Sequence, residues 1–175
     1  MLLTNQQKFL IDVVKKLGCV REDQLADLIR PVFCRRRPDI APALVHSAMR
    51  QLRHCNVDIR QGGDVFLRPG VLVDSAVLEA VDVMLQLSEC QPVDYGRGTP
   101  PVLLRFGIQS LESYSAFIVA QAAERLPDYL IAPADRIILL FDGQGQPTAL
   151  PVSNKQFFAV RQGDGTHRFF ALGGP

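Results

Sequence analysis

The chain has 175 residues, of which 47% are hydrophobic and 21% are charged, and its formal net charge is +1. This composition argues against a disordered chain, and the length suits one domain or two small ones. No apolar run approaches the ~20 residues of a membrane helix, and the N-terminus is too polar and too periodic for a signal peptide. We therefore expect a cytoplasmic protein without membrane contact.

The small net charge conceals an asymmetry along the chain. Residues 1–68 hold 12 lysines and arginines against 7 aspartates and glutamates, a balance of +5. Residues 69–175 hold 7 against 11, a balance of −4. This pattern predicts a first part that seeks anions and a second part with a different role.

Two helices are expected before residue 31. Thr4 and Gln7 have capping-box spacing, and apolar residues then recur at helical spacing up to Gly18. A second helix is predicted over 22–29, after a short link at Cys19-Val20, with acidic residues at its start and Pro31 as its stop.

The connector that follows carries Arg35, Arg36 and Arg37. An arginine triplet by itself is typical of a solvated loop. Its position just before the next helix favours contact with phosphates, because the backbone around the turn of a helix-turn-helix lies against the nucleic-acid backbone.

Residues 38–68 predict a helix followed by a hairpin. Asp39 is the expected N-cap and Pro42 fits the first turn. Apolar residues share one face of this helix, and polar or basic residues share the other: Leu44, Val45, Ala48, Met49 and Leu52 against His46, Ser47, Arg50, Arg53 and His54. Strands are expected at Val57–Arg60 and Val65–Arg68, joined by Gln61-Gly62-Gly63-Asp64.

Three helices and a hairpin predict a winged helix-turn-helix over residues 1–70, with duplex DNA as its partner. Ser47, Arg50 and Arg53 are the candidates for reading bases, since arginine pairs bidentately with guanine. His46 and His54 lie on the same face and could touch bases or phosphates. Phosphate contacts are expected from Arg35, Arg36, Arg37, Lys15 and Lys16, and wing contacts from Arg60 and Arg68. The alternative is that this domain contacts protein, in a dimer or with another partner.

Pro69-Gly70 marks a boundary, and residues 71–175 predict a second, α+β domain. Its first helix, over 74–88, either packs on its own sheet or pairs with its copy in a homodimer. A loop is expected at 91–101, strands at 102–106, 114–120, 136–141, 155–161 and 167–171, and a helix at 121–129. These elements predict one mixed sheet, which could also bind a protein partner.

The order of elements after residue 70 is reminiscent of a restriction-endonuclease-like fold, but the catalytic motif is absent. That chemistry requires D/E-x-K, and the only lysine after residue 68 is Lys155, with Ser153 two positions before it. Asp94, Asp128 and Asp142 suit loops and turns. We therefore expect a degenerate domain without catalysis, metal or cofactor, and retain a divergent nuclease that uses Asp142 as an alternative.

The four cysteines form no C-x-x-C pair and are expected to be free, mostly buried thiols. A metal site built on Cys34, His54 and Cys55 is disfavoured, because adjacent residues on a helix point about 100° apart.

Some segments together resemble a group of bacterial mobile-element proteins. They are TNQQKFL, GCVREDQLADLI and ALVHSAMRQL at the front, RIILLFD in the middle and FFAVRQGDGTHRFFAL at the end. The chain is similar to replication-relaxation and mobilisation-accessory families, which pair a winged helix with a degenerate restriction-endonuclease-like domain. The resemblance implies DNA binding in plasmid or conjugative-element replication, transfer or regulation. It supplies no catalytic residues.

Overall fold

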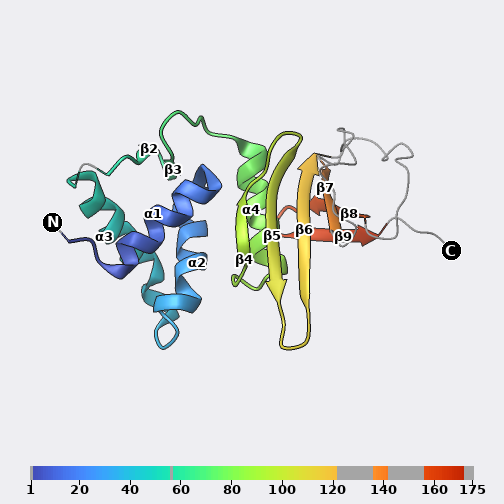
Figure 1. The fold of residues 1–175 in the computed structure, drawn as a ribbon, viewed down its shortest axis with the longest axis horizontal. Coiled ribbons are helices and arrows are strands. Elements are labelled where there is room, and N and C mark those ends of the chain that lie inside the picture. The colour runs from blue at the N-terminus through green and yellow to red at the C-terminus, as the bar shows by residue number, and fades with distance from the viewer. Residues whose placement is uncertain (1, 56, 122–135, 142–155, 172–175) are drawn as a thin grey trace.

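The structure, a computed structural model, describes residues 2–55, 57–121, 136–141 and 156–171 (Figure 1). Within these ranges the fold is α+β, as the sequence predicts, with four α-helices, a short 3-10 helix and two sheets. The first part comprises α1 (Asn5–Leu17), β1 (Cys19–Arg21), α2 (Glu22–Phe33), η1 (Pro38–Ile40), α3 (Ala41–Arg53), β2 (Arg60–Gly62) and β3 (Val65–Leu67). The second comprises α4 (Ser75–Leu87), β4 (Val93–Arg97), β5 (Val102–Gln109), β6 (Tyr114–Gln121), β7 (Arg136–Phe141), β8 (Gln156–Arg161) and β9 (His167–Ala171).

The first helix begins as the sequence predicts. The backbone N–H of Gln7 donates to Thr4 Oγ1 at 3.2 Å, and the backbone N–H of Thr4 donates to Gln7 Oε1 at 2.9 Å. This reciprocal capping box satisfies two amide groups at the start of α1. Gly18 ends the helix with φ of 80°, a conformation that favours glycine.

The prediction that Pro31 stops the second helix is wrong. Helix α2 continues to Phe33, and the Cys34 backbone N–H still donates to the Arg30 carbonyl at 3.0 Å. The Phe33 ring meets the Phe9 ring of α1 edge-on, with 5.6 Å between the centroids. This aromatic contact helps offset the helical hydrogen bond that proline cannot donate.

The third helix confirms the predicted apolar face but not the predicted cap. Ala41, Val45, Ala48, Met49 and Leu52 are buried, and Pro42 lies in the first turn. Ile40 occupies the N-cap position without a side-chain hydrogen bond. Asp39 instead faces Arg37 at 3.5 Å, because the turn η1 precedes the helix and supplies its entry.

The small sheet has three antiparallel strands in the order β1-β3-β2. The hairpin of β2 and β3 is confirmed, although its first strand begins at Arg60 rather than Val57. The prediction of a short link at Cys19-Val20 is wrong, because these residues belong to β1, in which Cys19 pairs with Leu67 and Arg21 with Val65. Three residues carry no strand signal alone, and only the distant β3 gives them a partner.

The larger sheet is mixed, with the order β4-β5-β6-β7-β8-β9. The predicted antiparallel pairs β5–β6 and β8–β9 are confirmed, and the interior strand β7 runs parallel to both neighbours. The loop predicted at 91–101 is wrong at Val93–Arg97, which forms β4 along the edge of β5. Gln121 closes β6, and the rest of the helix expected at 121–129 lies outside the described residues.

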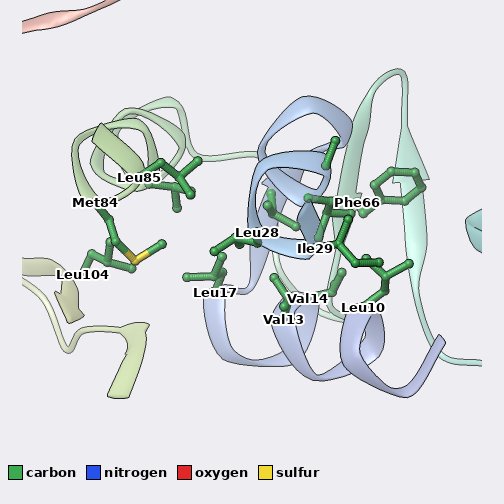
Figure 2. Close-up of a cluster of buried hydrophobic side chains, with 14 of the residues drawn as sticks. Leu10, Val13, Val14, Leu17, Leu28, Ile29, Phe66, Met84, Leu85 and Leu104 are labelled. Atoms are coloured by element: carbon green, nitrogen blue, oxygen red, sulfur yellow. The ribbon is translucent and has the colours of Figure 1, made fainter. Parts of the chain in front are cut away.

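Helix α4 connects the two sheets through apolar contacts. Cys19 and Val65 of the small sheet form one buried cluster with Val77 and Leu78. A larger buried cluster includes α1, α2, α3, α4 and the six-stranded sheet. Figure 2 shows this continuity: Leu17 and Leu28 lie between Met84 of α4 and the side chains that surround Phe66. The buried core continues across residue 70 and so does not mark a boundary there. The division into two domains at that residue therefore stays a prediction.

The polar side chains of α4 are bonded to elements on both sides. Asp82 Oδ1 accepts from Arg21 Nη2 at 2.6 Å and from Gln24 Nε2 at 2.7 Å. Gln86 bonds the backbone N–H and carbonyl of His167, both at 2.8 Å, and Glu79 lies 3.1 Å from His167 Nε2. Helix α4 therefore joins the front of the chain to β9.

None of the helices in the described ranges has the length and apolar character needed to cross a membrane.

Candidate nucleic-acid interface

Helix α3 occupies one end of the molecule. In Figure 1 it lies at the left, with α1 and α2 between it and α4, and the six-stranded sheet lies at the opposite end. At 100° per residue, Ser47, Arg50 and His54 line the middle of its outer face, and His46 and Arg53 flank them. All five are exposed, so the predicted polar face is open to solvent.

The arginines on and beside this face have no acidic partner among the described residues. Arg50 and Arg53 on α3, Arg60 on β2 and Arg68 after β3 are exposed. None forms an ion pair with another residue in the part of the chain that the structure describes. An exposed guanidinium without a carboxylate partner keeps its charge and its donors available for an external anion.

The arginine triplet divides into three environments. Arg35 donates from Nε to the Pro31 carbonyl at the end of α2. Arg37 faces Asp39 at 3.5 Å, with both side chains exposed. Arg36 is exposed and has no ion pair among the described residues. Of the three, Arg36 is the best placed to meet a phosphate.

His46 contacts an acidic residue, Glu22, that the sequence does not predict at this site. Its Nδ1 lies 3.1 Å from Glu22 Oε1, and the His46 side chain remains 68% exposed. The backbone N–H of Glu22 donates to the Asp64 carbonyl in the hairpin turn at 2.9 Å. Glu22 thus joins α2, α3 and the hairpin, and no local pattern signals a contact that depends on three separate elements.

The two lysines at the end of α1 differ in whether they form an ion pair. Lys16 forms an ion pair with Asp12 at 2.8 Å, and its Nζ lies 5.4 Å from the centre of the Tyr95 ring. Lys15 is exposed and has no ion pair within the described ranges. The structure therefore leaves Lys15 freer than Lys16 for a phosphate.

A groove of about 430 Å³ lies between α3 and the hairpin. Met49, Leu52 and Phe66 form its floor, and each is only 2% exposed. The remaining lining residues are Arg53, Val57, Ile59, Gln61 and Gly63. The sequence predicts the helix and the hairpin separately, but not the space between them, because that space depends on their packing angle.

Within the described ranges, the residues considered for metal or nuclease chemistry do not come together in a site. No group of three or more His, Cys, Asp and Glu side chains that could hold a metal occurs among the described residues. Asp94 lies in β4, and Asp128 and Asp142 fall outside the described ranges. None of the four cysteines forms a disulfide, and burial raises the pKa of the Cys19 and Cys90 thiols.

Comparison of the chain with protein-family models, with curated proteins and with solved structures finds no match. The resemblance to mobile-element proteins therefore stays a prediction, and the case for a function rests on the geometry of α3 and the hairpin.

Proposed function

We propose that this chain is a non-enzymatic protein that binds duplex DNA through α3 and the β2–β3 hairpin. Within this proposal, residues 1–70 are a winged helix-turn-helix. The element order α1-β1-α2-α3-β2-β3 and the sheet order β1-β3-β2 support that description. The observation that carries the proposal is the set of exposed arginines on and beside α3 that form no ion pair with the described residues, of which Arg50, Arg53 and Arg60 are the central members.

The dimensions of α3 suit the major groove. A helix of 13 residues is about 20 Å long, and the major groove is about 12 Å wide, so its two ends can reach the flanking backbones. Arg36 precedes the helix, and Arg53 and Arg60 lie at or beyond its end. Ser47 and Arg50 then face the base edges, and the remaining arginines face phosphates.

The six-stranded sheet lies away from this face, and we assign it to self-association or a protein partner. The mobile-element resemblance favours a role as an accessory or regulatory factor of a plasmid or conjugative element. The nuclease-like description of this part rests on its element order alone, and no D/E-x-K accompanies it.

Fluorescence anisotropy with a labelled random-sequence duplex at two salt concentrations tests the proposal. The natural chain should bind more weakly at the higher salt concentration, with a log–log slope of about 0.9 per phosphate contact. The double variant Arg50→Ala plus Arg53→Ala should bind at least about tenfold more weakly, because it removes two charges from the proposed contact surface.

A matched control is Arg161→Ala plus Arg168→Ala, which removes the same charge from exposed positions on β8 and β9. This control should change affinity much less, since β8 and β9, which carry the two arginines, lie at the opposite end of the molecule from α3 (Figure 1). No binding at low salt, or equal losses in both double variants, would refute the proposed interface.

The second candidate is a protein-interaction module that uses the same region. The half-buried Val57 and Ile59 in the groove favour it, because apolar side chains at a concave surface suit a protein contact. Light scattering of the full chain, with and without Val57→Lys, separates the two: a dimer that this substitution dissociates, together with no DNA affinity, would favour the protein-binding role.

A further inference from the structure

The groove between α3 and the hairpin has an apolar floor that the paired bases of a duplex cannot contact. Its floor is apolar and tightly packed, since Met49, Leu52 and Phe66 are each 2% exposed. Val57 and Ile59 are only partly buried and add exposed aliphatic surface. A base pair inside a duplex presents only its edges to a protein, because its flat faces are stacked on the neighbouring pairs and cannot reach such a floor.

The rim of the groove is cationic and polar. Arg53 lines it, and its guanidinium has no ion pair among the residues that the structure describes. Gln61 Nε2 donates to the Gly63 carbonyl at 2.6 Å, which holds the Gln61 side chain across the hairpin turn. Its Oε1 is left as an acceptor for the N–H groups of a ligand. Arg60 precedes Gln61 in β2 and points to the opposite face of the strand, so Arg53 is the cation that lines this rim.

The size of the groove matches a small planar ligand. At about 430 Å³ it lies in the range of ~300–1,000 Å³ for sites that hold small molecules, and a nucleobase is smaller than those ligands. The combination of an apolar floor, an amide acceptor and the Arg53 guanidinium at the rim is complementary to a nucleobase that carries its phosphate with it.

We propose that this groove receives one unpaired nucleobase, so that the protein prefers DNA with an extrahelical base over fully paired DNA. Because base insertion presupposes contact through α3, it rests on the proposed function. The duplex would lie along Arg50, and Arg53 would hold the phosphate beside the extruded base. An already unpaired base has the least stacking and pairing energy to lose, which makes it the preferred occupant.

Three labelled duplexes of one sequence test this proposal by anisotropy. The first is fully paired, the second carries one extra thymidine, and the third carries one extra abasic nucleotide in the same place. The chain should bind the thymidine bulge about tenfold more tightly than the paired duplex, and the abasic bulge about as weakly as the paired one. The abasic duplex keeps the local flexibility and removes only the base.

Val57→Trp fills the groove and should abolish the preference for the thymidine bulge. Val73→Trp places the same side chain at an exposed position outside the groove and should leave the preference intact. Equal affinity for the thymidine and abasic bulges, or a preference that survives Val57→Trp, would overturn base insertion and leave duplex binding in place. A chain that binds none of the three duplexes would overturn both proposals.

Discussion

Helices α3 and α4 have the same length, 13 residues, and opposite surroundings. Helix α3 buries one face and exposes a polar face with Ser47, Arg50 and Arg53. Helix α4 buries Val77, Leu78, Ala80, Val81, Val83, Met84 and Leu85, which cover most of its circumference. After its first turn its polar residues are Glu79, Asp82 and Gln86, and all three are bonded to other elements.

The comparison separates a helix that is available to a partner from a helix that holds the fold together. Unpaired charge on α3 contributes little to folding and is free for recognition, because exposed charges stabilise a fold only weakly. The bonded polar groups on α4 are costly to disrupt, because each leaves a partly buried partner without its bond. The expected effects of substitutions should therefore differ sharply between the two helices.

The largest effect is expected when α4 is removed altogether. A fragment of residues 1–70 should lack a cooperative thermal transition in circular dichroism, because the buried cluster of Cys19, Val65, Val77 and Leu78 loses half of its members. A fragment of residues 1–90, which retains α4, should recover a transition. A fully cooperative 1–70 fragment would show that α4 is dispensable for the front of the chain.

A smaller loss of stability is expected when Asp82 is replaced. The side chains of Arg21 and Asp82 are 23% and 15% exposed, so Asp82→Ala leaves a largely buried guanidinium with fewer partners. The free energy of unfolding in urea should fall by about 1–3 kcal/mol. Asp39→Ala, which breaks an exposed pair with Arg37, should cost less than about 0.5 kcal/mol. Similar losses in both variants would contradict the role assigned to α4.

A third prediction concerns Tyr95, which lies where β4 packs against α1. Burial and, to a smaller extent, the Asp12 carboxylate raise the pKa of Tyr95 from 10 to about 12. A raised pKa in the folded state stabilises the fold fully below pH 10, and this contribution is lost as the pH rises from 10 to 12.

Between these two pH values the natural chain should lose about 1–2 kcal/mol more unfolding free energy than Tyr95→Phe, a figure reduced because the side chain is only partly buried. Urea unfolding of both chains at the two pH values measures this difference. Identical pH dependence in the two chains would show that Tyr95 ionises freely in the fold.

The smallest effect on stability is expected on α3. Arg50→Ala plus Arg53→Ala should change the free energy of unfolding by no more than about 0.5 kcal/mol, because both side chains are exposed and form no ion pair with the described residues. Urea unfolding measures it. A loss of several kcal/mol would mean that any reduced DNA affinity of this variant reflects a damaged fold.

Much of the candidate site follows from local patterns in the sequence. The apolar residues of α3 recur at helical spacing, which fixes its buried face and therefore exposes Ser47, Arg50 and Arg53 on the other. The sequence could not show that His46 meets Glu22, because that contact joins two separate helices. The pairs Asp12–Lys16, at i,i+4 spacing, and Arg37–Asp39 are local, and counting charges without this spacing overstates the number of unpaired cations.

By itself, the sequence determined the elements whose signals are local. The capping box at Thr4 and Gln7, the amphipathic α3 and the hairpin of β8 and β9 depend on residues only a few positions apart. The tertiary structure alone decided β1 and the continuation of α2 through Pro31, because each depends on a distant partner. Strand β4 pairs with the neighbouring β5, but the proline and glycine residues around it predict a loop. It also decided that the core runs unbroken through α4, since a helix that is apolar nearly all round does not reveal how many neighbours it will cover.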